Sequence, residues 1–156
     1  MARVPGDPQG GDPYGLGRFA AVQDAGGTYR RAVAELRAGR KVSHWMWFVF
    51  PQLTGLGRSA TAQKYAISSP DEARAYLRHP VLGPRLAQCA RVLTEVTGRS
   101  AEQIFGALDA QKLRSSMTLF LRADPEGPSG PLFAQVLSQY FDGQPDPATG
   151  RLLNAG

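Results

Sequence analysis

The stretch from Ser43 to Leu53, with the sequence SHWMWFVFPQL, constrains the fold of this chain more than any other. It holds both tryptophans of the protein and two of its seven phenylalanines, and six large apolar residues follow one another from Trp45 to Phe50. Because aromatic side chains bury more area than other residues, this run is expected at the centre of the core. Its composition suits either a strand or a buried helix. No other segment alternates with a period of two, so a strand would lack a partner and a helix is favoured.

The remaining chain has the apolar spacing of amphipathic helices, interrupted by glycine and proline. Four residues are predicted to cap the N-terminus of a helix: Thr28, Ser69, Ser100 and Asp109. The spacing predicts helices near residues 16–23, 28–37, 59–67, 70–78, 82–96, 100–105, 109–121 and 132–141, with a short C-terminal turn from residue 147. The predicted fold class is all-α: a single multihelical bundle packed around the aromatic-rich segment, residues 43–53.

The length of 156 residues suits one globular domain, which we expect at residues 14–153. Residues 1–13, rich in Gly, Pro and Asp, are expected to form a disordered tail. No apolar run is long enough for a membrane span, and the N-terminus lacks the apolar centre of a signal peptide. A single cysteine, Cys89, excludes an internal disulfide and a cysteine-rich metal site. The expectation is a cytoplasmic protein with no membrane contact, no metal and no cofactor.

The positive charge is concentrated around the aromatic segment. Residues 30–64 hold seven basic side chains against Glu35 alone, whereas residues 65–156 hold nine of each sign and the net charge is +5. Such a cluster indicates either an anion site or an ordinary solvated helix face.

Several side chains within or near the aromatic segment are candidates for ligand contacts. His44 could act as a general base or as an anion-binding donor, or it could simply cap the preceding helix. Trp45 and Trp47 could offer an aromatic face to a ligand, or both could lie in the core. Gln52 follows closely and could orient a ligand. Arg58 lies in a glycine loop, residues 55–59, that could approach an anion or serve only as a connector.

A polar stripe on a later helix completes the candidate site. Asp109, Lys112 and Ser116 have the spacing i, i+3, i+7 on one helix face, with Ser115 beside them. Asp109 is the second candidate for a catalytic base. The alternative is a surface ion pair with solvated serines.

Read from end to end, the chain resembles the bacterial family catalogued as domain of unknown function 1810, some members of which have been labelled calpastatin-like. The residues that carry the resemblance include Arg18-Phe19, Gln23, Glu35–Lys41, Ser43–Leu53, Gly55–Ser59, Tyr65–Ile67, Glu72-Ala73, Tyr76-Leu77, His79–Gly83, Ile104–Gly106, Asp109, Lys112 and Ser115–Phe120. The resemblance spans about Tyr14 to Leu153. It implies an all-α fold and no established activity.

Three hypotheses of function remain open at this point. The first is a site for a phosphorylated or nucleotide-like anionic small molecule beside residues 43–53, where the ligand is bound and possible hydrolysis would use His44 or Asp109. The second is a nucleic-acid-binding accessory domain that uses the basic excess. The third is a protein-interaction module of helices without chemistry. The sequence leaves the oligomeric state open.

Overall fold

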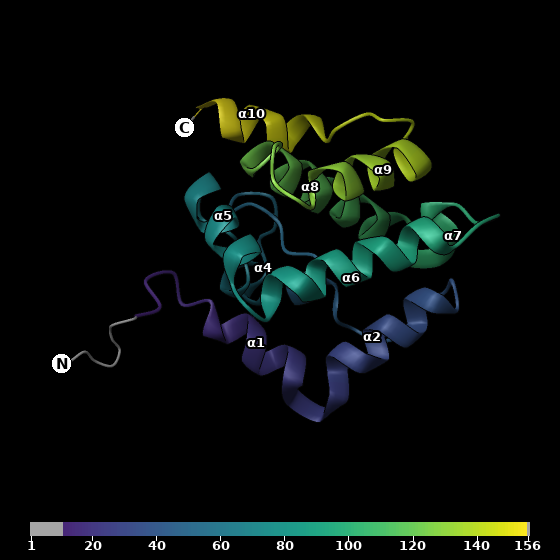
Figure 1. Cartoon of the computed structure of the whole chain (residues 1–156), viewed down its shortest axis with the longest axis horizontal. Coiled ribbons are helices and arrows are strands. Elements are labelled where there is room, and N and C mark those ends of the chain that lie inside the picture. The colour runs from purple at the N-terminus through teal and green to yellow at the C-terminus, as the bar shows by residue number, and fades with distance from the viewer. Residues whose placement is uncertain (1–10, 156) are drawn as a thin grey trace.

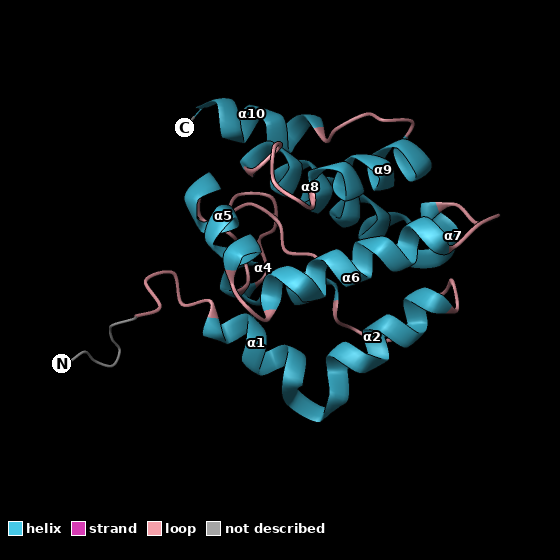
Figure 2. Ribbon diagram, in the orientation of Figure 1, coloured by secondary structure: helices cyan, strands magenta, loops and turns pink. Residues whose placement is uncertain are grey.

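A computed structural model describes residues 11–155, and these residues are almost entirely helices and connecting loops (Figure 2). The helices are α1 (Gly17–Asp24), α2 (Thr28–Arg37), α3 (Met46–Val49), α4 (Ala60–Lys64), α5 (Pro70–Arg78), α6 (Leu82–Glu95), α7 (Ala101–Phe105), α8 (Ala107–Ala123), α9 (Gly130–Phe141) and α10 (Pro147–Ala155), with a 3₁₀ turn, η1, at Ala25–Gly27. Within the described residues there is no β-strand, only one parallel bridge between Leu53 and Ile67. The all-α prediction is confirmed.

The helices pack in an order that Figure 1 shows. Helix α6 crosses the middle of the view, with α2 on one side and α9 on the other, and it packs against both. Helix α8 lies behind α9 and also packs against α5, α7 and α10. The first part of the chain, α1 and α2, forms a V whose apex is the η1 turn. Gly26 and Gly27 make this apex possible, because both have positive φ angles, 59° and 71°, that other residues rarely adopt.

The aromatic segment lies in the core, as predicted. Trp45 is 1% exposed and Phe50 is fully buried, and both rings contact Phe105 from α7, with centroids 6.4 and 6.3 Å away. A second set of rings continues the core through Phe48, Tyr65, Phe19, Tyr76, Phe120 and Phe133. The predicted helix here is a single turn, α3, because Pro51 follows and lacks the N–H group that would extend it.

Local capping signals account for several helix starts. The side chains of Ser59, Ser69 and Ser100 each accept a hydrogen bond from the backbone N–H three residues later, and Ser100 forms a capping box with Gln103. Two predicted caps are wrong. Gly27 occupies the cap position of α2, and the Thr28 hydroxyl donates backwards to the carbonyl of Ala25. Helix α8 begins at Ala107, so Asp109 lies inside its first turn.

The expected N-terminal tail lies mostly outside the described residues. Its end is described, and there the carboxylate of Asp12 accepts hydrogen bonds from the N–H groups of Leu16 and Gly17, at 2.7 and 2.8 Å. Asp12 therefore satisfies two free donors at the start of α1. None of the helices in residues 11–155 is both long and apolar enough to cross a membrane.

Candidate functional site

Glu35 on α2 fixes the loop that leads into the aromatic segment. Its Oε1 atom accepts hydrogen bonds from the backbone N–H groups of Val42 and Ser43, at 2.8 and 2.9 Å, and from Nε1 of Trp45 at 2.9 Å. The hydroxyl of Ser43 donates to Oε2. Partial burial alone would raise the pKa of Glu35, but these hydrogen bonds outweigh it and lower the pKa to about 2. The loop is therefore held by an ionised carboxylate.

The same loop carries Lys41 to the first turn of α8. Lys41 Nζ lies 2.8 Å from Oδ2 of Asp109, and Lys112 Nζ lies 2.9 Å from Oδ1 of the same carboxylate. Only 8% of the Lys41 side chain is exposed, against 17% for Lys112 and 22% for Asp109. The backbone N–H of Lys41 donates to the carbonyl of Ile104 at 2.7 Å, which ties the loop to α7. Two ammonium groups thus share one carboxylate.

Both ammonium groups also lie over the tryptophan rings. Lys41 Nζ is 5.1 Å from the ring centroid of Trp45, and Lys112 Nζ is 4.6 Å from that of Trp47. Each distance is within the range of a cation–π contact. We call Lys41, Trp45, Trp47, Asp109 and Lys112 the lysine–aspartate site. It joins the aromatic segment to the polar stripe on α8.

Asp109 is held as a carboxylate. Burial would raise its pKa, but the hydrogen bonds and the positive charges of Lys41 and Lys112 lower it overall. A general base works best with a pKa near the working pH, so this environment disfavours proton abstraction by Asp109. It suits an electrostatic role.

The glycine loop covers the far edge of Trp47. A β-carbon at Gly57 would lie 3.2 Å from Cζ3 and Cη2 of Trp47 and 2.5 Å from Cβ of Ala62, so only glycine fits this contact. Arg58, the next residue, has an exposed side chain, and its carbonyl accepts a hydrogen bond from Gln63 Nε2 at 2.9 Å. The loop therefore packs against Trp47 at Gly57.

The other predicted site residues have different surroundings. His44 is exposed, and Gln52 is half-buried and accepts through its carbonyl from the N–H of Ile67 at 2.8 Å. Ser115 donates to the buried carboxylate of Asp146 at 3.1 Å, so it belongs to the attachment of α10. Ser116 is fully buried, and its hydroxyl has no hydrogen-bond partner among the described residues.

Two residues of the arrangement were missed as site residues by the sequence reasoning. Lys41 counts there only as one of the cations after the helix at 28–37, and Glu35 only as the single acid among residues 30–64. The isolation of Glu35 among basic residues was the signal in the sequence that could have identified its role. A lone carboxylate amid seven basic residues is a natural partner for donors in the nearby loop.

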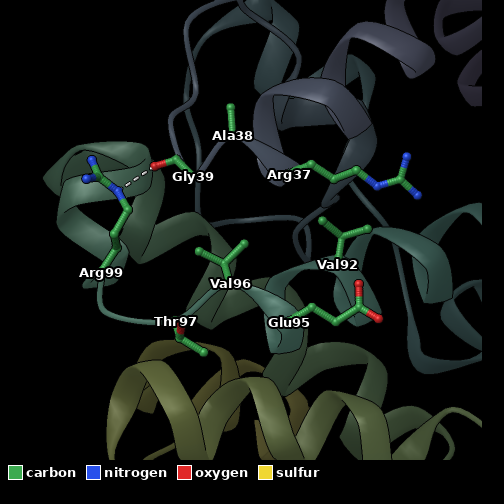
Figure 3. A pocket seen from close by; sticks show the side chains of 8 residues that line it. All are labelled: Arg37, Ala38, Gly39, Val92, Glu95, Val96, Thr97 and Arg99. Carbon is green, nitrogen blue, oxygen red and sulfur yellow. Dashed lines mark hydrogen bonds between the residues drawn. The ribbon is translucent and has the colours of Figure 1, made fainter.

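The cavities among the described residues include two of similar volume. One, of about 410 Å³, lies where α2 and α6 both end (Figure 3). It is lined by Arg37, Ala38, Gly39, Val92, Glu95, Val96, Thr97 and Arg99. Arg99 turns away to donate from Nε to the carbonyl of Gly39 at 2.7 Å, and Arg37 and Glu95 extend toward the opposite end. None of the predicted site residues lines this cavity.

The second cavity, of about 420 Å³, lies at the end of the aromatic segment. Leu53, Thr54, Ser68, Ser69, Pro70, Leu152 and Leu153 line it. This lining has no charged side chain, so the cavity offers no positively charged partner to a buried anion.

The described residues were also compared with the requirements of a metal site and of a nucleophilic cysteine. No group of three or more His, Cys, Asp or Glu residues there is arranged to hold a metal ion. Cys89 is buried, and burial raises the pKa of its thiol to about 12, so the nucleophilic thiolate is disfavoured.

Comparison with known proteins gives the chain a family and no activity. A structure search found the crystal structure of the conserved hypothetical protein Rv1873 from Mycobacterium tuberculosis, with 52% sequence identity and a TM-score of 0.86. The match covers 92% of this chain and 99% of that chain. A search of the curated proteins found no match. The model of the family described as "Protein of unknown function (DUF1810)" matches residues 13–153, and the chain therefore belongs to this family.

Proposed function

We propose that this protein binds a phosphorylated, nucleotide-like small anion at the lysine–aspartate site. The observation that carries the proposal is the convergence of Lys41 and Lys112, 71 positions apart in sequence, on one carboxylate beside both tryptophans. Ammonium groups are strong donors to phosphate oxygens, and these two are held in place by the surrounding side chains.

The charge balance around the site favours an anion. Two lysines face one aspartate, so these three side chains together carry one net positive charge. The nearby carboxylate of Glu35 is negative as well, but it is bound by donors from residues 42–45. Helix α8 begins beside them, and its cap residue, Gly106, supplies no side-chain acceptor to the first turn. The helix dipole therefore adds positive potential at the same place.

Further contacts could come from exposed residues at the edges. Trp47 is half-buried and can present aromatic surface to a nucleobase. Arg58 follows the glycine that packs on Trp47, and His44 precedes Trp45, and we propose these two exposed side chains as further contacts to the phosphate. The lowered pKa of Asp109 favours binding over hydrolysis by this residue.

The test is a binding screen of the wild-type protein and of Lys112→Gln. Wild type should be stabilised against heat by ADP, ADP-ribose or a sugar phosphate, since a ligand that binds only the folded state raises its stability. Calorimetry with the best ligand should show about tenfold weaker binding for Lys112→Gln, the loss of roughly one charge-assisted hydrogen bond.

Lys64→Gln is the matched control. It removes the same charge from a lysine that also lies over an aromatic ring, 5.4 Å from the centroid of Tyr65, and it should bind like wild type. A flat response of wild type to every phosphorylated compound would contradict the proposal. Binding only to nucleic acid, weakened by salt and equal in all three proteins, would favour the accessory-domain hypothesis instead.

A further inference from the structure

We infer that Asp109 occupies the place of the ligand's anionic group and must leave the two lysines before a ligand can contact them. This inference rests on the proposed function. Asp109 then competes with the ligand for the two lysines and weakens ligand binding. A residue that positioned the lysines for the ligand would strengthen it.

The first argument is the order of exposure. Asp109 is the most exposed of the three charged side chains, at 22%, and Lys41 beneath it is only 8% exposed. The two ammonium groups bind its two oxygens separately, at 2.8 and 2.9 Å. Each ammonium group gives one of its three N–H donors to Asp109. A phosphate that arrives from solvent meets the more exposed carboxylate first and is repelled by its negative charge, so it competes with Asp109 for the same positive charges.

The second argument is that the lysines have other partners when Asp109 leaves. Lys41 remains over Trp45 and Lys112 over Trp47, and Trp45 itself is fixed by its hydrogen bond to Glu35. The ammonium groups therefore keep their positions and gain free donors. With Asp109 turned away, the two lysines present two positive charges, neither of which is paired with the carboxylate of Asp109.

The third argument is that Asp109 can move without disturbing the backbone. It lies in the first turn of α8, where its own N–H group is not needed for a bond within the helix. Its side chain is short, and rotation about one bond carries the carboxylate toward solvent. The same helix start that now stabilises the carboxylate of Asp109 would then stabilise a bound phosphate.

The experiment measures ADP and inorganic phosphate binding to wild type, Asp109→Asn and Asp71→Asn. Asp109→Asn should bind both probes about tenfold more tightly, as expected if the lysines are free of Asp109 roughly one-tenth of the time in wild type. Asp71→Asn removes a carboxylate that is 72% exposed and paired with Arg74 on α5, and its affinities should equal those of wild type. Asp109→Ser, which also suits the first turn of a helix, replaces Asp109→Asn if that variant does not fold.

The outcomes separate the inference from the proposed function. Tighter binding by the Asp109 variant than by a wild-type protein that also binds supports the inference. Wild-type binding that is equalled or weakened in the Asp109 variant overturns the inference and leaves the proposed function standing. If neither protein binds ADP or phosphate, the inference is overturned, and the proposed function falls with it if wild type also fails to bind ADP-ribose and sugar phosphates.

Discussion

Glu35 shows how one side chain can hold a loop that has no regular structure. Four donors from residues 42–45 converge on its carboxylate. A glutamine could accept only through its amide oxygen, because its amide nitrogen is a donor. The pKa of Glu35 in the folded protein is about 2, below its ordinary value of 4.5. The carboxylate therefore stabilises the fold above pH 4.5, and this contribution is lost as the pH falls toward 2.

Glu35→Gln should lower the free energy of unfolding at pH 7 by about 2 kcal/mol, because four donors, three of them in partly buried bonds, lose a charged acceptor. The variant should also lose less stability than wild type between pH 4.5 and 2. Urea unfolding at a series of pH values measures both effects. Glu126→Gln, in an exposed loop, is the control and should match wild type throughout. Equal stability of Glu35→Gln and wild type would refute the role assigned to Glu35.

The residues of the lysine–aspartate site illustrate what the sequence could predict at this scale. Trp45, Trp47, Asp109 and Lys112 were predicted as site residues, and the structure brings these four together. Lys41 could not be placed with them, because its contact to Asp109 spans 68 residues and depends on how α7 and α8 pack. Ser115 was predicted as a ligand residue and is bonded to Asp146, a partner 31 residues away that local spacing does not reveal.

At the scale of an element, Asp146 attaches the last helix to the rest of the molecule. Its carboxylate is 3% exposed and accepts from Gln111 at 2.6 Å, from Ser115 at 3.1 Å, and from the N–H and hydroxyl of Thr149 at 2.9 and 2.6 Å. Its own N–H donates to the hydroxyl of Thr118 at 2.8 Å. One residue thus caps α10 and binds it to α8.

Asp146→Ala should therefore destabilise the protein by about 3 kcal/mol, through loss of the cap and of buried charged hydrogen bonds. Amide hydrogen exchange should rise first in α10, since its remaining contacts are few and exposed. Asn154→Ala, which removes an exposed hydrogen bond between α10 and Arg122, is the control and should change stability little. Protection of α10 that survives Asp146→Ala would show that its apolar contacts suffice.

Helix boundaries were predictable where the signal is local and failed where it is not. The serine caps at residues 69 and 100 were predicted correctly because each side chain bonds to a backbone group three residues away. Thr28 was misread because two glycines let the chain reverse before it, which frees its hydroxyl to bond to Ala25. Asp109 was misread because α7 and α8 meet at Gly106 without a loop in which a cap could stand.

At the scale of the whole molecule, one hydrophobic core joins residues from Leu16, just before α1, to Leu137 on α9. Both tryptophans lie at or next to this core, whereas the helices are spread along the whole described chain. We therefore expect tryptophan fluorescence, which reports on the core, and circular dichroism, which reports on the helices, to follow the same unfolding event.

Unfolding by urea should consequently give the same midpoint by tryptophan fluorescence and by far-ultraviolet circular dichroism. Both curves should fit a single transition with one value of the free energy of unfolding. A urea midpoint by fluorescence clearly below the midpoint by circular dichroism would contradict this expectation. It would show that the aromatic segment unfolds before the helices.

The shape of residues 43–53 is imposed from outside, since α3 has only four residues and the two indoles contact Phe105 of α7 and Lys112 of α8. A chain that grows from its N-terminus on the ribosome exposes the two indoles before residues 101–123 have been made. During that interval the aromatic segment, the most hydrophobic part of the chain, is not yet packed against the later helices. The risk of association with other nascent chains is therefore greatest just before α8 is completed.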